Sequence, residues 1–364
     1  MFKKEVIIIS AEERSDIGTM CRSILCKVNL PDVLKITFFS HAENDEEYLE
    51  HVNTLRAAVK ERYPQEIPLV SYVAQKSAGD TLIAEVASLV HAEDIRIEHH
   101  EQYTLLSNSS CTEIVTAGII PSDLSKNTFE QSEEIFSVIA DILQSNGFAP
   151  SDIYRQWNYI QGITMLNDGS QNYQEFNDAR SIFYSGCDWS NGYPAATGIG
   201  TDAGGVMVEL FAIKEKGLIN KPIDNPLQIA AHNYSQEVLE GKAAEALLEK
   251  STPKFERARI LGDTIYISGT AAIKGEHSNT CNDATEQTAE TMEVMNRLVS
   301  KDNIPTANGG AEYDILRVYV KRESDIPAIM EYMQQHYPAT LKHYTVADVC
   351  RPELLVEIEG VAHI

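Results

Sequence analysis

The sequence has few cysteines and few basic residues, and these shortages exclude several classes of protein. Its six cysteines are scattered over 364 residues, and none forms a C-x-x-C pair or has histidine neighbours at zinc spacing. Only 30 lysines and arginines stand against 54 aspartates and glutamates, so the formal net charge is −24. Such a chain repels phosphate backbones and anionic membranes, because binding to polyanions depends on lysine and arginine. We therefore expect no metal site, no nucleic-acid partner and no membrane partner.

Long apolar runs and common cofactor motifs are also missing. No stretch approaches the roughly 20 apolar residues that span a bilayer. The short apolar run 6–9 is soon followed by Glu12 and Glu13, so it predicts a strand and not a signal peptide. There is no G-x-G-x-x-G after a strand, no P-loop, no H-E-x-x-H and no G-x-S-x-G. These absences favour a cytoplasmic protein with reduced thiols.

The clearest positive feature is an internal repeat. Residues 113–213 show the pattern strand, helix, strand, helix, strand, and residues 263–361 show it again, with Glu209 aligned to Glu357. The expected helices are 134–143, 173–184, 288–299 and 325–336, and the expected strands are 113–120, 154–163, 205–213, 263–270, 313–321 and 354–361. Residues 1 to about 100 show no such repeat and are interpreted as an N-terminal elaboration, with strands at 5–10, 33–39 and 67–74 and helices at 46–61 and 78–91.

This order predicts an α+β fold of two domains, residues 1–214 and 215–364. Each domain is expected to hold a mixed sheet with helices packed on one face. The other face has to be buried, most simply against the matching face of the twin domain. A junction of this kind is a common place for a small-molecule site.

Glu357 is the most interesting carboxylate. In the segment Leu354-Leu-Val-Glu-Ile-Glu-Gly360 the alternation of a strand places Glu357 and Glu359 on one face. An apolar junction would raise the pKa of such a carboxyl group and suit a proton donor. The alternative is an ordinary solvent-facing glutamate, and Glu209 in the first copy supports that alternative.

Three arginines are candidates for binding a substrate carboxylate, because the guanidinium fork binds carboxylates through two hydrogen bonds. Arg317 alternates with apolar neighbours on a strand, Arg257 lies just before a strand, and Arg180 lies on a helix. Each of them also fits a surface salt bridge. Cys350, which precedes the last strand, also fits a small buried hydrophobe. The turn 268–272 contains small residues that allow close approach to the backbone.

Several segments resemble a known superfamily. The segments similar to RidA/YjgF-type domains are Ile267-Ser-Gly-Thr-Ala-Ala-Ile-Lys-Gly275, Gln287-Thr-Ala-Glu-Thr291, Arg317-Val-Tyr-Val320, Leu355-Val-Glu-Ile-Glu359 and Asn233-Tyr-Ser-Gln-Glu-Val238. Within that superfamily the landmarks of the chorismatases are matched by Tyr193-Pro-Ala-Ala-Thr-Gly-Ile-Gly200, Phe176-Asn-Asp-Ala-Arg180, Asn225-Pro226 and Phe255-Glu-Arg-Ala258. The resemblance covers roughly residues 150–364.

The resemblance implies two RidA-like domains and an enzyme without a cofactor that removes pyruvate from chorismate. By position, Glu357 matches the glutamate that protonates the enolpyruvyl methylene carbon. Arg257 and Arg317 would hold the two carboxylates, with Tyr234 and Arg180 also binding substrate. Cys350, facing the small Ala271 or Ala272, matches the branch that forms 3-hydroxybenzoate in place of a dihydrodiol. The expected partner is a small carboxylate substrate, and a homo-oligomer is possible.

Two other functions stay open. A RidA-type enamine or imine deaminase needs an arginine at the entry to the last strand, and residues 342–350 contain none before Arg351. The third possibility is a protein that binds a small metabolite without catalysis.

Overall fold

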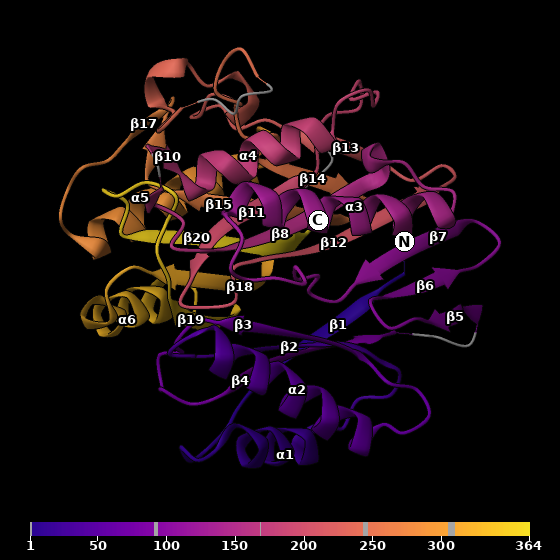
Figure 1. Ribbon diagram of the computed structural model, residues 1–364. Coiled ribbons are helices and arrows are strands. Elements are labelled where there is room, and N and C mark those ends of the chain that lie inside the picture. The colour runs from indigo at the N-terminus through magenta and orange to yellow at the C-terminus, as the bar shows by residue number, and fades with distance from the viewer. Residues whose placement is uncertain (1, 91–93, 168, 243–246, 305–309) are drawn as a thin grey trace.

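The computed structural model describes residues 2–90, 94–167, 169–242, 247–304 and 310–364. Within these residues three sheets form the interior, and the α-helices cover them from outside (Figure 1). We name the sheets and their helices unit 1 (β1–β4), unit 2 (β5–β12) and unit 3 (β13–β20). In Figure 1 the helices of unit 1 lie at the bottom, those of unit 2 at the top and those of unit 3 at the left.

Each unit has its own set of elements. Unit 1 contains β1 (Lys4–Ser10), α1 (Ile17–Lys27), β2 (Val33–Ser40), α2 (Asp45–Arg62), β3 (Leu69–Ala74) and β4 (Ile83–Leu89). Unit 2 contains β5 (Arg96–His99), β6 (Tyr103–Ser107), β7 (Cys111–Thr116), α3 (Thr128–Ser145), β8 (Ile153–Gln161), α4 (Asn172–Phe183), β11 (Ala195–Thr201) and β12 (Val206–Glu215). Unit 3 contains β13 (Asn220–Ile223), β14 (Ala258–Leu261), β15 (Thr264–Ala271), α5 (Ala284–Leu298), β18 (Glu312–Val320), α6 (Ile326–His336), β19 (Leu341–Val346) and β20 (Val356–His363). The short hairpins β9 (Leu166–Asn167)–β10 (Ser170–Gln171) and β16 (Ile273–Lys274)–β17 (His277–Ser278) accompany units 2 and 3.

The three units share one topology. The strand orders are β1-β4-β2-β3 in unit 1, β5-β6-β7-β12-β8-β11 in unit 2 and β13-β14-β15-β20-β18-β19 in unit 3. Four strands of each unit follow the same order: β1-β4-β2-β3, β7-β12-β8-β11 and β15-β20-β18-β19. In each of these four-stranded cores the last strand in the chain lies between the first and the second. One edge pair of each core is parallel: β2 with β3, β8 with β11, and β18 with β19. The predicted repeat is therefore present, and it occurs three times.

The interpretation of residues 1–100 as a non-repeating elaboration is wrong at the level of topology. Residues 4–89 form a complete copy of the strand–helix–strand–helix–strand–strand pattern, although their sequence does not match the other copies. The division at residues 214 and 215 stays a prediction. The predicted helix at 78–91 is also wrong, because Ile83–Leu89 is strand β4. Nearly every residue of β4 is buried, and such a segment loses the alternation by which a half-buried strand is recognised.

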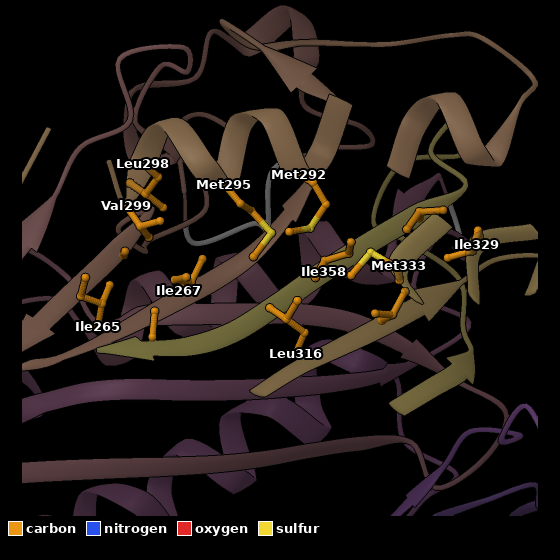
Figure 2. Close-up of a cluster of buried hydrophobic side chains, with 14 of the residues drawn as sticks. Ile265, Ile267, Met292, Met295, Leu298, Val299, Leu316, Ile329, Met333 and Ile358 are labelled. Atoms are coloured by element: carbon orange, nitrogen blue, oxygen red, sulfur yellow. The ribbon is translucent and has the colours of Figure 1, made fainter. Parts of the chain in front are cut away.

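The helices pack their apolar faces on the outer faces of the sheets. In unit 3, Met292, Met295 and Leu298 of α5 lie over Ile267 and Ile358 of the sheet, and all five are buried (Figure 2). In unit 2 the start of α3 is fixed by a reciprocal capping box between Asn127 and Glu130. Among the described residues, no helix is long and apolar enough to cross a membrane.

The inner faces of the three sheets pack against one another. One apolar cluster joins Phe39 of unit 1, Met207 of unit 2 and Tyr319 of unit 3. Next to it lies a cyclic set of buried ion pairs, each between the last strand of one unit and the strand after the first helix of another. The pairs are Glu85 with Arg317 (2.5 Å), Glu209 with Lys35 (2.9 Å) and Glu359 with Arg155. Each sheet is therefore covered by both of the others and not by one twin alone.

Candidate active site

Glu357 lies at the junction between units 2 and 3. It stands on the inner face of β20, opposite Ala271 of β15 and Tyr319 of β18, and is only 4% exposed. Edge strand β11 of unit 2 closes the junction, because Gly269 N–H donates to Thr197 Oγ1 at 3.1 Å. The carboxyl group is therefore held between two sheets and not at the surface.

The surroundings of Glu357 favour its protonated form. Burial raises the pKa of Glu357 to about 8, although the nearby charges of Arg155 and Arg257 oppose the rise. A Cβ atom on Gly269 would lie 2.0 Å from Glu357 Oε1, so only glycine leaves room for the carboxyl group there. A carboxylic acid that remains largely protonated at neutral pH can donate a proton to a substrate.

Arg257 and Tyr234 form one wall of the site. Arg257 Nη2 donates to Tyr234 Oη and to the carbonyl of Ile229, both at 2.6 Å. The guanidinium lies 5.5 Å from the ring centre of Phe255, which fixes its plane. Buried Arg257 Nε has no hydrogen-bond partner among the described residues. Arg257 thus presents a free donor to a small anion.

Helix α4 supplies a second arginine and a tyrosine. Arg180 is 1% exposed, its Nη2 donates to Asn177 Oδ1 at 2.5 Å, and burial lowers its pKa. Burial also raises the pKa of Tyr173; the charges of Cys350 and Glu357 add to the rise, and the charge of Arg180 opposes it. The structure therefore brings α4 and the Glu357 junction together. Sequence analysis missed Tyr173, which stands at the start of a helix with no distinguishing pattern.

Cys350 lies close to Glu357 but is no nucleophile. Burial, followed by the charge of Glu357, raises the pKa of the Cys350 thiol to about 12. A thiol with this pKa stays protonated at neutral pH.

Arg317 lies elsewhere. Arg317 Nε and Nη2 donate to the two oxygens of Glu85 at 2.8 and 2.5 Å, and Nη1 donates to Tyr159 Oη at 2.9 Å. Its guanidinium is thus held in the ionic layer between the three units and is not brought to the group around Glu357. The charge of Arg155 on β8, by contrast, acts on Glu357.

Arg155 links the ionic layer to the junction. Its Nη2 donates to Thr197 Oγ1 at 2.8 Å and to Glu359, while Nη1 has no described partner. Burial and the neighbouring Arg317 lower the pKa of Arg155 to about 9, which leaves it charged at neutral pH. Sequence analysis missed Arg155. The only signal was a charged residue in an otherwise buried strand.

Comparison with known proteins finds similarity to chorismatases. A family model described as "Chorismatase FkbO/Hyg5-like, N-terminal" matches residues 89–212. The "3-hydroxybenzoate synthase" of Streptomyces hygroscopicus is 29% identical over 294 residues, which cover 76% of this chain and 82% of that protein. A "Chorismatase" of the same organism is 28% identical over 266 residues, which cover 69% of this chain and 72% of the relative. The chain is thus similar to chorismatases over most of its length.

The fold agrees with this family. The crystal structure of a chorismatase matches with a TM-score of 0.72 at 21% identity, over 99% of this chain and 98% of its own. The predicted α+β class is confirmed, and so are two units that each hold a mixed sheet with helices on one face. Unit 1 adds a third copy of their common core.

The pseudo-equivalence of the units also corrects the alignment between the two predicted copies of the repeat. Glu209 lies three residues after the start of β12, the last strand of unit 2, and Glu359 lies three residues after the start of β20, the last strand of unit 3. Both line the space between the three sheets. The counterpart of Glu209 is therefore Glu359 and not Glu357, whose equivalent is Met207. Glu359 accepts hydrogen bonds from Tyr319 and Trp157 at 2.6 and 3.0 Å, which hold it in the ionic layer between the three units.

Proposed function

We propose that the protein removes pyruvate from chorismate, with Glu357 protonating the methylene carbon of the enolpyruvyl group. The observation that carries this proposal is a buried carboxyl group whose pKa is raised to about 8, beside Arg257 with an unpartnered donor. Relatives named chorismatase and 3-hydroxybenzoate synthase support the choice of substrate. No step assigned to these residues calls for a cofactor.

The chemistry follows from the placement of the acid. Chorismate carries two carboxylates, and the free Nε of Arg257 is placed to bind one of them. Glu357 gives its proton to the methylene carbon, which leaves an oxocarbenium ion at the adjacent carbon and a carboxylate on Glu357. Addition of water to that ion gives a hemiketal, and its collapse breaks the bond to the ring oxygen and releases pyruvate. The negative charge formed on Glu357 lies near Arg155 and Arg257, which stabilise it.

We propose 3-hydroxybenzoate as the ring product. Hydrolysis alone consumes one water molecule and gives a dihydrodiol. Formation of the hydroxybenzoate also removes one water molecule from the ring, so the overall reaction of that route neither consumes nor releases water. The support is Cys350 next to Glu357 and the relative named 3-hydroxybenzoate synthase. Replacement Cys350→Ala is expected to shift the product towards the dihydrodiol. Chromatography of the ring product would contradict this if the wild-type protein gives the dihydrodiol alone.

The test of the reaction is release of pyruvate from chorismate, followed with lactate dehydrogenase and NADH. We expect Glu357→Gln to lower kcat by about 10²–10⁴-fold, the usual contribution of a general acid. Glu133→Gln, the same substitution at an exposed position of α3, is the matched control and is expected to keep full activity. Equal pyruvate release by wild type and Glu357→Gln would remove Glu357 from the reaction.

One observation keeps the imine deaminase as a second candidate. Arg351, at the entry to the last strand, stacks on Tyr234 with 5.2 Å between guanidinium and ring centre. Release of ammonia from an imine substrate, without pyruvate from chorismate, would favour this candidate.

A further inference from the structure

The inner faces of the three sheets enclose a cavity of about 980 Å³ that is separate from the site around Glu357. Strands of all three units line it, among them β2 and β4 of unit 1, β8 and β12 of unit 2, and β18 and β20 of unit 3. Neither Glu357 nor Arg257 belongs to its lining. Its size falls in the range of pockets that hold small organic ligands, about 300–1,000 Å³.

The buried end of the cavity carries unused hydrogen-bonding groups of both kinds. Arg155 uses Nη2 for Thr197 and Glu359, but its buried Nη1 has no hydrogen-bond partner in the described part of the chain. Glu209 pairs with Lys35 through Oε2 at 2.9 Å, and its buried Oε1 accepts no hydrogen bond from a described residue. Buried polar atoms without a partner are costly, so a ligand that supplies both an acceptor and a donor would be stabilised there.

Flat aromatic walls stand beside these groups. The ammonium of Lys35 lies 5.8 Å from the ring centre of Trp157 and 5.6 Å from that of Phe211, and Lys4 lies 5.5 Å from Phe211. Aromatic side chains stack on planar rings and bury much apolar surface in doing so. The cavity therefore combines aromatic walls with the three buried ion pairs of the interior, Lys35–Glu209, Arg155–Glu359 and Arg317–Glu85.

We propose that this cavity is a second small-molecule site and that it binds a hydroxylated aromatic carboxylate. The carboxylate of the ligand accepts from Arg155 Nη1 and from the ammonium of Lys35. Its hydroxyl donates to Glu209 Oε1, and its ring packs against the exposed side of the Trp157–Phe211 pair, whose ring centres lie 5.0 Å apart edge to face. A ligand with only one of the two polar groups leaves the other buried partner unsatisfied.

The same residue connects this cavity to the junction. Arg155 bonds Thr197 of β11 and Glu359 of β20, and its charge acts on Glu357. A ligand bound at Nη1 therefore changes the surroundings of the proton donor. The proposed product, a hydroxybenzoate, belongs to the class of ligand that the cavity would bind. Binding of the product in the cavity would therefore alter the turnover rate, and only this effect on turnover rests on the proposed function.

The test is a calorimetric titration of the full chain with 3-hydroxybenzoate, without turnover. Ala87 lines the cavity from β4, and Ala87→Phe fills it. Ala57→Phe, on the exposed face of α2, adds the same bulk outside it and is the matched control. We expect Ala87→Phe to lose one bound equivalent that wild type, Ala57→Phe and Arg257→Ala all retain. Ala87→Leu, a smaller filling, carries the test if the phenylalanine variant does not fold.

Two ligand analogues sharpen the result. Benzoate and phenol each lack one of the polar groups and are expected to bind this equivalent at least about tenfold more weakly than 3-hydroxybenzoate. The proposal is overturned if filling at Ala87 leaves stoichiometry and affinity unchanged, or if benzoate and phenol both bind as tightly as 3-hydroxybenzoate. Because only binding is measured, absence of pyruvate release from chorismate would refute the proposed function and leave this result intact.

Discussion

Replacement Glu357→Gln is expected to stabilise the fold, and the gain should grow with pH. Burial raises the pKa of Glu357 to about 8, against an ordinary value of 4.5. Between these two values the folded protein holds a proton that the unfolded chain releases, so the stability of wild type falls as pH rises through this window. Glutamine fills the same space without titrating, and the variant escapes this loss.

The magnitude follows from the width of the window. Each pH unit within it costs about 1.4 kcal/mol of unfolding free energy. Below pH 4.5 both states of wild type are protonated and the cost vanishes, and above pH 8 it is constant. Between pH 5 and pH 8 the advantage of the variant over wild type should therefore grow by about 3 kcal/mol.

Urea unfolding at pH 5, 6, 7 and 8 measures this difference directly. Glu133→Gln, on the solvent face of α3, is the control and should follow wild type at every pH. The reasoning is refuted if the difference between Glu357→Gln and wild type is the same at all four pH values. Glu357 would then titrate as an ordinary exposed carboxyl group.

Two further predictions separate the site from the interior. Arg257→Ala should lower kcat/KM for chorismate by about 10²-fold with little change in melting temperature. Arg317→Met should destabilise the fold by about 3 kcal/mol, because the buried Glu85 then keeps only His343 as a partner. Steady-state kinetics and thermal unfolding of both variants check this, and the reverse pattern would place Arg317 at the substrate. Gly269→Ala should abolish pyruvate release, because its Cβ would stand 2.0 Å from Glu357 Oε1 and displace the acid; a fully active, folded variant would show that the carboxyl group need not stand there.

Much of units 2 and 3 could be predicted from the sequence because helix and strand periodicities are strong there. The predicted helix at 325–336 and strand at 154–163, for example, agree with α6 and β8 within a few residues. Unit 1 could not be recognised as a copy. Topology is set by the order and packing of elements, and β4 is buried on both faces, which removed the alternation that marks a strand.

The site shows the same limit at single residues. Alternation correctly placed Glu357 and Glu359 on one face of β20, but it does not tell which unit covers each residue. Arg317 was assigned to the substrate because a guanidinium group binds carboxylates well and because the family resemblance places it there. That partner is Glu85, more than 200 positions earlier in the chain, and only the packing of unit 1 on unit 3 brings the two together.

The pH dependence of kcat/KM for pyruvate release from chorismate tests the central claim most directly. If protonated Glu357 donates the proton, kcat/KM is constant at neutral pH and falls about tenfold per pH unit above an inflection near pH 8. The residual activity of Glu357→Gln should lack this inflection. A rate that rises with pH through this region would show that Glu357 acts as a base or not at all, and would contradict the account.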